Sequence, residues 1–85
     1  MKAFEYIIRD PVGIHARPAG LLAAKAKEYR SEILIRRGEK SANAARLLAV
    51  MGLCIKHGDT VTVTVSGEDE ARACEELKDF FGTHF

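Results

Sequence analysis

The segment Gly13-Ile14-His15-Ala16-Arg17-Pro18-Ala19 places an imidazole and a guanidinium at the predicted start of a helix. Pro18 suits the first helical turn, where its missing N–H is no loss. We expect His15 at the N-cap, beside backbone N–H groups that lack partners and favour anions. Arg17 adds a fixed charge that can contact phosphate oxygens. A neutral imidazole beside such an anion site is suited to accept and carry a phosphoryl group.

Two other interpretations of the histidines and cysteines are less well supported. A single histidine before a helix often only fills a loop, but the combination with glycine, Arg17 and Pro18 favours chemistry at His15. The remaining candidate metal ligands have no ligand-like spacing. They are Cys54, His57, Cys74 and His84. We therefore expect no metal and no cofactor, a turn role for His57, a mobile tail position for His84 and buried apolar roles for both cysteines.

Length and composition predict one ordinary globular domain, residues 1–85. The chain has 47% hydrophobic and 29% charged residues and a formal net charge of +1. It contains no apolar run of the roughly 20 residues that a membrane span needs, and its first residues lack the layout of a secretory signal. We expect a cytoplasmic protein with no membrane insertion. The near-neutral charge argues against a strong nucleic-acid binder.

The charges are unevenly distributed along the chain. Residues 11–57 carry nine basic and three acidic side chains, whereas residues 58–85 carry two basic and seven acidic ones. One surface could therefore be basic enough to attract acidic partners.

Hydrophobic periodicity predicts four strands and three helices. Phe4–Arg9 and Thr60–Ser66 alternate as strands do, and Ala19, Leu22, Ala23 and Ala26 form a helical stripe. The expected strands are 4–9, a segment around 33–35, 40–43 and 60–66; the expected helices are 16–29, 46–53 and 68–81. The last helix should bury Ala71, Cys74, Leu77 and Phe81 and stop at Gly82.

This order, β-α-β-β-α-β-α, predicts an α+β open-faced sandwich. Strands that alternate apolar and polar residues form a sheet with one face in water and the other covered by helices. Periodicity leaves open whether the first strand–helix–strand connection joins neighbouring parallel strands or passes over one strand position.

The segment 13–19 resembles the active-site signature of HPr, the histidine-containing phosphocarrier of the bacterial phosphotransferase system. The similarity extends over essentially the whole chain and includes Leu47–Leu53, the Gly58-Asp59 turn and Ser66-Gly67. It implies a four-stranded antiparallel sheet covered on one face by three helices, with a first connection that passes over a strand position. It also implies a phosphoryl-transfer intermediate rather than a stand-alone enzyme.

The resemblance further implies partners and site residues. Enzyme I would donate a phosphoryl group to Nδ1 of His15, Arg17 would assist, and IIA domains of sugar permeases would accept the group. The phosphate-binding residues would be Ala16, Arg17 and Pro18.

A carrier that docks on several proteins needs a patch with an apolar centre and a basic rim. The short helix has too many large apolar residues to bury them all. The expected partner-binding residues are Gly20, Leu21, Ala24, Lys27, Arg46, Leu47, Leu48 and Met51. The expected rim is Arg17, Lys25, Lys27, Arg46 and Lys56.

Position 46 departs from the pattern of Gram-positive HPr proteins. The resemblance implies a regulatory serine there, the substrate of an ATP-dependent kinase, but this chain has Arg46. Arginine has no hydroxyl to phosphorylate and cannot cap a helix as serine does. We expect no kinase control at this position, although Ser31 and Ser41 are nearby alternatives, and a greater attraction to acidic partners.

Two competing functions keep a similar fold. The first is an HPr-like regulatory paralogue that binds transcription factors or metabolic enzymes, against which the presence of His15 and Arg17 counts. The second is an open-sheet nucleic-acid module, which would need aromatic residues where this sheet offers Thr60, Thr62 and Thr64. We expect a monomer.

Overall fold

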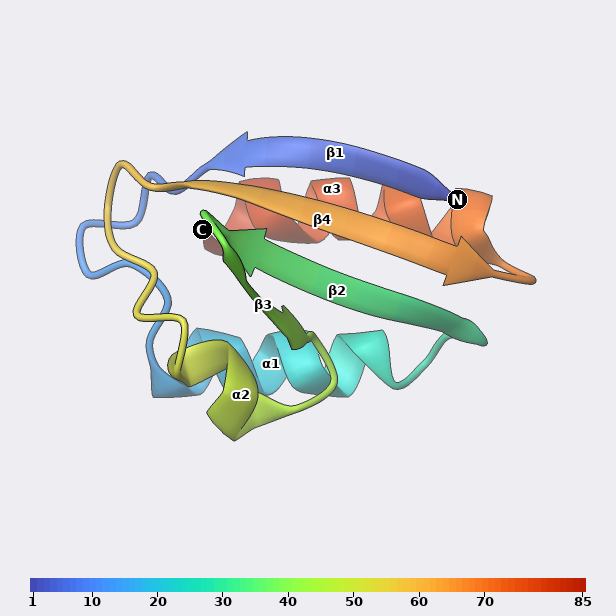
Figure 1. Ribbon diagram of the computed structural model, residues 1–85, viewed down its shortest axis with the longest axis horizontal. Coiled ribbons are helices and arrows are strands. Elements are labelled where there is room, and N and C mark those ends of the chain that lie inside the picture. Colours follow the sequence, from blue (N-terminus) through green and yellow to red (C-terminus); the bar gives the residue numbers. More distant parts are fainter.

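Four antiparallel strands form one sheet, in the order β1-β4-β2-β3 (Figure 1). The computed structural model describes residues 1–85. The elements are β1 (Lys2–Ile7), α1 (Ala16–Ala26), β2 (Ser31–Arg37), β3 (Lys40–Asn43), α2 (Leu47–Met51), β4 (Thr60–Gly67) and α3 (Glu70–His84). Because β4 pairs with both β1 and β2, the connection through α1 passes over one strand position. The question that periodicity left open is answered as the family resemblance implied.

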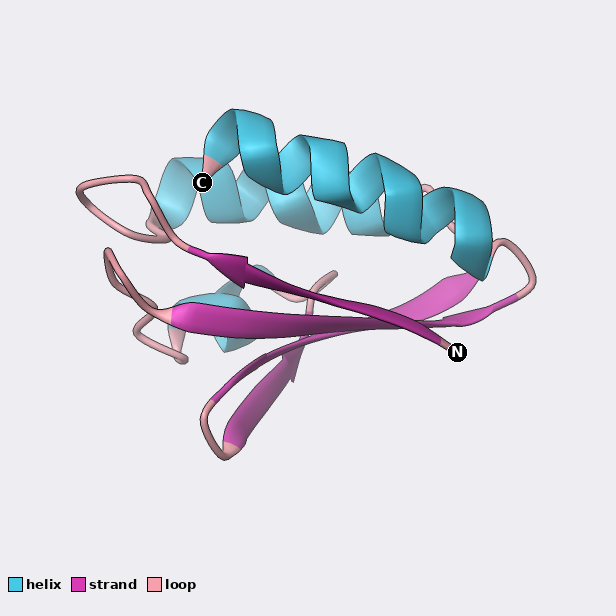
Figure 2. Ribbon diagram, turned by 90° about the horizontal axis from the view of Figure 1, so that it is seen from above, coloured by secondary structure: helices cyan, strands magenta, loops and turns pink.

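Helices α1 and α3 cover one face of the sheet, and the other face is open (Figure 2). Helices α1 and α3 run in opposite directions, so that the start of α1 lies near the end of α3 (Figure 1). The short α2 packs against α1 and β3. The predicted α+β open-faced sandwich is confirmed.

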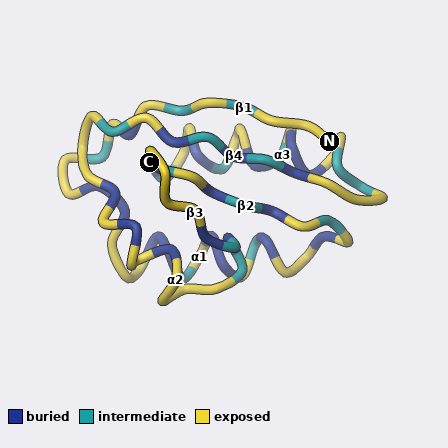
Figure 3. Tube along the Cα trace, in the orientation of Figure 1, coloured by how far each residue is buried: buried dark blue, intermediate teal, exposed yellow.

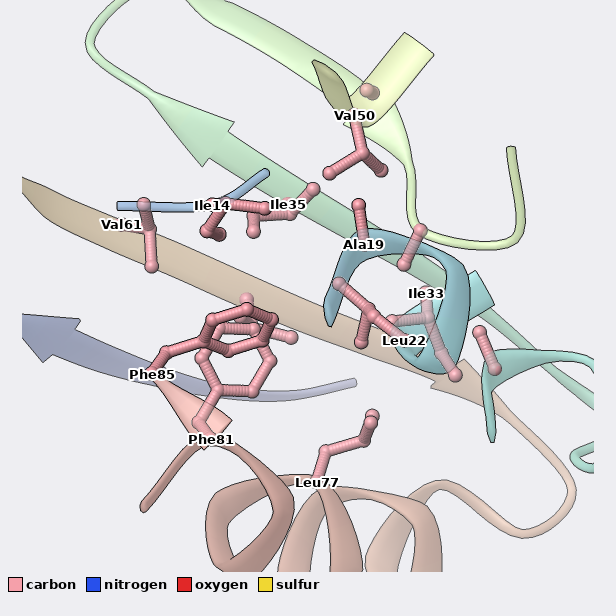
Figure 4. Close-up of a cluster of buried hydrophobic side chains, with 14 of the residues drawn as sticks. Ile14, Ala19, Leu22, Ile33, Ile35, Val50, Val61, Leu77, Phe81 and Phe85 are labelled. Atoms are coloured by element: carbon pink, nitrogen blue, oxygen red, sulfur yellow. The ribbon is translucent and has the colours of Figure 1, made fainter. Parts of the chain in front are cut away.

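The core lies between this sheet and the helices (Figure 3). Its largest part is a cluster of 21 buried residues. The predicted alternation holds in β4, where Val61, Val63 and Val65 are buried and the threonines between them are not. The predicted stripe of α1 is buried as well. Phe81 and Phe85 fill the space between α3 and the strands, next to Leu77 (Figure 4).

The prediction of a helix stop at Gly82 is wrong. Helix α3 continues to His84, and the Phe85 N–H still donates to the Phe81 carbonyl at 2.8 Å. Phe81 and Phe85 stand one turn apart and are both buried, at 1% and 4% exposure. Burial of this second aromatic ring outweighs the weak helix propensity of one glycine.

Other boundaries differ by a few residues. Helix α3 begins at Glu70 because β4 extends through Gly67, and Ala73 rather than Ala71 faces the core. Helix α1 ends at Ala26 instead of residue 29. Strand β1 covers residues 2–7 and α2 only 47–51. Of the cysteines, Cys74 is buried as expected, whereas Cys54 is exposed in a loop at φ 53°.

None of the helices combines the length and the apolar character that a membrane crossing requires.

Candidate functional site

His15 is the N-cap residue of α1, as the sequence predicted. Its backbone is extended (φ −121°, ψ −177°), and its imidazole is exposed and makes no capping hydrogen bond. The His15 carbonyl accepts the first helical hydrogen bond, from the Ala19 N–H at 2.9 Å. The N–H groups of Ala16 and Arg17 have no acceptor within the chain. The imidazole therefore stands next to free donors at the positive end of a helix.

Gly13 sets the approach of the chain to His15. Its φ is +79°, and a Cβ at this position would lie 2.4 Å from the carbonyl oxygen of Ile55 and 2.7 Å from Cα of Lys56. The next residue, Ile14, is buried and donates its N–H to the Ile55 carbonyl at 3.1 Å. Only glycine combines this backbone conformation with so close an approach. The loop is thus held against residues 55–56, with His15 at its exposed end.

Asp10 and the end of α3 hold the other side of this loop. The Asp10 carboxylate accepts the Val12 N–H at 2.9 Å, and its carbonyl accepts the Gly13 N–H at 3.0 Å. The backbone oxygen of Phe85 accepts N–H groups from Arg9 at 2.6 Å and from Asp10 at 2.9 Å. A distant part of the chain therefore fixes the loop that carries His15.

A shallow hollow of about 350 Å³ lies at His15. It is lined by Asp10, His15, Arg17, Pro18, Leu21 and His84. His84 was expected in a mobile tail, but it is the last residue of α3, half-buried, with its ring 4.3 Å from that of Phe80. His57 occupies a turn, as expected, where its Nδ1 lies 3.2 Å from the Arg9 carbonyl oxygen.

Of the three predicted phosphate-binding residues, Arg17 and Pro18 line this hollow and Ala16 does not. Ala16 and Arg17 offer free backbone N–H groups, and the Arg17 side chain lines the hollow and is exposed. Pro18 has no N–H to donate; it is buried and shapes the wall. Backbone donors, a guanidinium and an accessible imidazole together suit a tetrahedral anion attached to the ring.

A larger hollow, of about 520 Å³, shares no residue with the first. It lies at the β2–β3 hairpin and the start of β4 and has no hydrophobic lining residue. The Arg37 guanidinium there is already bonded to the Asp59 carboxylate at 2.8 Å and to the Leu53 carbonyl at 3.2 Å. Backbone donation from Lys56, followed by the Arg37 bond, lowers the pKa of Asp59. This hollow contains a structural ion pair and neither histidine nor cysteine.

The residues predicted to bind partners lie on the exposed sides of α1 and α2. Leu48 is 82% exposed, and Leu21, Leu47 and Met51 are also exposed. Ala24, Lys27 and Arg46 are exposed and Gly20 is half-buried, whereas Val50 and Leu53 belong to the core.

Lys25 does not belong to the rim of this patch, contrary to expectation. Its ammonium lies 3.6 Å from Glu76 on α3 and 3.8 Å from Glu28. The pKa of Lys25 is raised, mainly by its side-chain interaction with Tyr29 and further by the negative charges of Glu28 and Glu76. The lysine thus joins α1 to α3, while Arg17, Lys27, Arg46 and Lys56 remain exposed.

The fold and the site together define an open-faced sandwich with an accessible histidine at a helix start whose first N–H groups are free. The chain belongs to the HPr family of the phosphotransferase system: residues 2–83 match the family model described as "PTS HPr component phosphorylation site".

Relatives and solved structures agree with this membership. The phosphocarrier protein HPr of Lysinibacillus sphaericus is 49% identical over 77 residues, which are 91% of this chain and 88% of that protein. The HPr-like protein Crh of Halalkalibacterium halodurans is 40% identical over 70 residues, 82% of this chain and 83% of that one. The crystal structure of HPr-C-His from Thermoanaerobacter tengcongensis superposes with a TM-score of 0.93 at 32% identity, covering 100% of this chain and 96% of the other.

Sequence reasoning missed two residues of the hollow, Asp10 and His84. Asp10 belongs to the turn before His15, where it accepts the Val12 N–H. The signal for His84 was the spacing of Phe81 and Phe85, which extends the last helix by one turn and brings His84 to the start of α1.

Proposed function

We propose that residues 1–85 form a single phosphocarrier domain that accepts a phosphoryl group on His15 from phosphorylated Enzyme I. The group then passes to IIA domains of sugar permeases. The observation that carries this proposal is the exposed His15 imidazole at the N-cap of α1, beside the unused N–H groups of Ala16 and Arg17.

The chemistry follows from this arrangement. Nδ1 of neutral His15 forms a bond to the phosphorus of a phosphohistidine on the donor while the P–N bond of the donor breaks. The donor's imidazole, which carries a proton on its other ring nitrogen, leaves as a neutral group. The Arg17 guanidinium and the helix N–H groups stabilise the charge on the phosphoryl oxygens in the transition state. The same groups do not enclose the phosphoryl group, because the hollow is shallow and His15 is exposed. The next partner can therefore reach it.

Docking uses the exposed apolar residues of α1 and α2. Leu48 is 82% exposed, and Leu47, Met51 and Leu21 are exposed on the same two helices. Arg17, Lys27 and Arg46 are exposed in or at the ends of the same helices, and their charges favour acidic partner faces. Arg46 replaces the regulatory serine of Gram-positive HPr proteins, so this surface keeps its positive charge permanently.

Phosphoryl uptake tests the proposal. The chain is incubated with phosphoenolpyruvate, Mg²⁺ and Enzyme I from the same source, and intact mass and ³¹P NMR report an acid-labile phosphorus–nitrogen bond. Uptake that His15→Ala abolishes and His57→Ala leaves unchanged supports the carrier function. No uptake by the folded wild-type chain, or uptake that persists in His15→Ala, contradicts it.

The second candidate is a regulatory HPr-like protein that acts by binding transcription factors or metabolic enzymes. The relative named HPr-like protein Crh favours this alternative. The presence of both His15 and Arg17 in the hollow favours the carrier. Binding of a regulatory partner with equal affinity by wild type and His15→Ala, without phosphoryl uptake, would favour the second candidate.

A further inference from the structure

Helix α3 brings a second imidazole to the hollow that contains His15. His84 lines this hollow together with Asp10, His15 and Arg17, although it lies 69 positions after His15 in the sequence. Helices α1 and α3 run in opposite directions, so the end of α3 and the start of α1 lie at the same end of the molecule (Figure 1).

The position of His84 is fixed from both sides. Its ring lies against Phe80, with centroids 4.3 Å apart and planes tilted by 43°. The next residue, Phe85, is buried, and its backbone oxygen holds Arg9 and Asp10. An imidazole on this turn of α3 is therefore part of the folded domain.

The surroundings of His84 are the last turn of α3 and the polar groups of the hollow. His84 lies in the last turn of α3, where the unpaired carbonyls give the helix its negative end. The other charged or titratable groups of the hollow are Asp10 from the β1–α1 loop and His15 and Arg17 from the start of α1. The Asp10 carboxylate already accepts the Val12 N–H. A phosphoryl group on His15 would add about two negative charges to this space.

We propose that His84 is a second phosphate-contacting residue, whose protonated imidazole stabilises the phosphoryl group on His15. This inference rests on the proposed carrier function. The phosphoryl group would then have two cationic contacts: one to Arg17, whose charge is permanent, and one to His84, whose charge depends on pH.

Anion binding provides a test that does not depend on Enzyme I. Sulfate is the probe, because it is a tetrahedral dianion at every pH used, and its affinity is measured by NMR titration of the Ala16 and Arg17 amides at pH 6.0 and pH 8.5. His84→Phe keeps the ring packing on Phe80 and removes the charge and the N–H; His84→Gln keeps a neutral donor. We expect His84→Phe to weaken sulfate binding about two- to fivefold at pH 6.0 and to have little effect at pH 8.5. His84→Gln should resemble His84→Phe.

The phosphorylated chain gives the reciprocal measurement. When Enzyme I and phosphoenolpyruvate phosphorylate His15, the ¹⁵N titration midpoint of His84 should rise by about 0.3 to 0.7 pH unit. This is the rise expected if the phosphoryl group favours protonated His84 about two- to fivefold, as the sulfate ion should. His57 is the internal control, and its midpoint should not move.

The two failures are distinguishable. If Enzyme I does not phosphorylate His15, the carrier function fails, and the sulfate comparison still decides the role of His84. Equal sulfate affinities of wild type and His84→Phe at pH 6.0, or an equal loss at both pH values, would overturn the contact with protonated His84. An unchanged His84 midpoint in a chain phosphorylated at His15 would overturn it as well.

Discussion

The backbone oxygen of Phe85 accepts the N–H of Asp10 at 2.9 Å and so joins the end of α3 to the loop that carries His15. Asp10 in turn bonds the Val12 and Gly13 N–H groups. The last buried aromatic residue of the chain therefore stabilises both the core and the site. The geometry of His15 depends on the packing of α3, as well as on the local sequence around the histidine.

Removing the Phe85 ring should loosen this loop. Phe85→Ala creates a cavity next to Phe81 and should lower the free energy of unfolding by about 3 kcal/mol. Amide hydrogen exchange at Arg9 and Asp10 should accelerate more than exchange in β4, because the end of α3 frays first. Thr83→Ala, at an exposed position of the same turn, is the control. Unchanged protection of both amides in Phe85→Ala would show that α3 does not hold the loop.

Gly13→Ala should damage the site by steric conflict. The new methyl group would meet the Ile55 carbonyl and residue 56, and φ of +79° is unfavourable for alanine. We expect a loss of about 2–4 kcal/mol in unfolding free energy, with a displaced His15. Gly38→Ala is the matched control, since φ is +60° there but a Cβ would contact nothing within 4 Å. It should cost only about 1 kcal/mol. Equal melting temperatures of the two variants would exclude the steric explanation.

Much of this architecture follows from local patterns. Alternation in residues 60–66 and the alanine-rich stripe of α1 predict which residues are buried, since strand and helix periods fix the inward faces. The start of α1 follows from Pro18 and from the loop before it. The local sequence therefore predicts His15 at the N-cap, where the structure has it.

The remaining features depend on tertiary contacts that periodicity does not encode. Strand order is one of them, because β1 and β2 alternate in the same way whether or not β4 lies between them. The end of α3 is another: Gly82 is a stop signal locally, and burial of Phe85 overrides it. Because the helix continues past Gly82, His84 lines the same hollow as His15. The exposure of Cys54 likewise follows from its turn conformation at φ 53° and not from its apolar side chain.

Leu48→Ala should separate docking from stability. Its side chain is 82% exposed, so the free energy of unfolding should change by less than about 0.5 kcal/mol. If Leu48 is at the centre of the docking patch, affinity for Enzyme I should fall about five- to thirtyfold. Ile7→Ala is the matched control, since Ile7 is 60% exposed on β1 outside the patch. Calorimetric titration with Enzyme I measures the affinity of each variant. Equal affinities of Leu48→Ala and Ile7→Ala would show that Leu48 is not part of the interface.

Arg46 should prevent serine phosphorylation of α2. Incubation of the chain with an ATP-dependent HPr kinase, followed by mass spectrometry, should give no phosphoserine. Arg46→Ser is the positive control, because serine at this N-cap position restores both a hydroxyl and a capping group that Arg46 lacks. A phosphoserine at Ser31 or Ser41 of the wild-type chain would contradict the expected absence of kinase control.

Asp69 should make the stability of the fold depend on acid pH. Its carboxylate accepts the Ser31 hydroxyl and the Arg30 N–H at 2.9 Å, and so joins the start of α3 to the start of β2. The Ser31 bond, followed by the Arg30 bond, lowers the pKa of Asp69 below its ordinary value of 3.8. Because the pKa of Asp69 is lower in the folded than in the unfolded chain, the ionised carboxylate stabilises the fold at pH values above its pKa in the unfolded chain. This stabilisation is lost as the pH falls through the pKa of Asp69 in the folded chain.

Chemical unfolding of wild type between pH 7 and pH 2.5 should therefore show a decline in stability that starts below about pH 5. Asp69→Asn should be less stable at pH 7 and should show a shallower decline, whereas the exposed Asp79→Asn should follow wild type. Parallel pH profiles for Asp69→Asn and wild type would mean that the carboxylate gains nothing from these two hydrogen bonds.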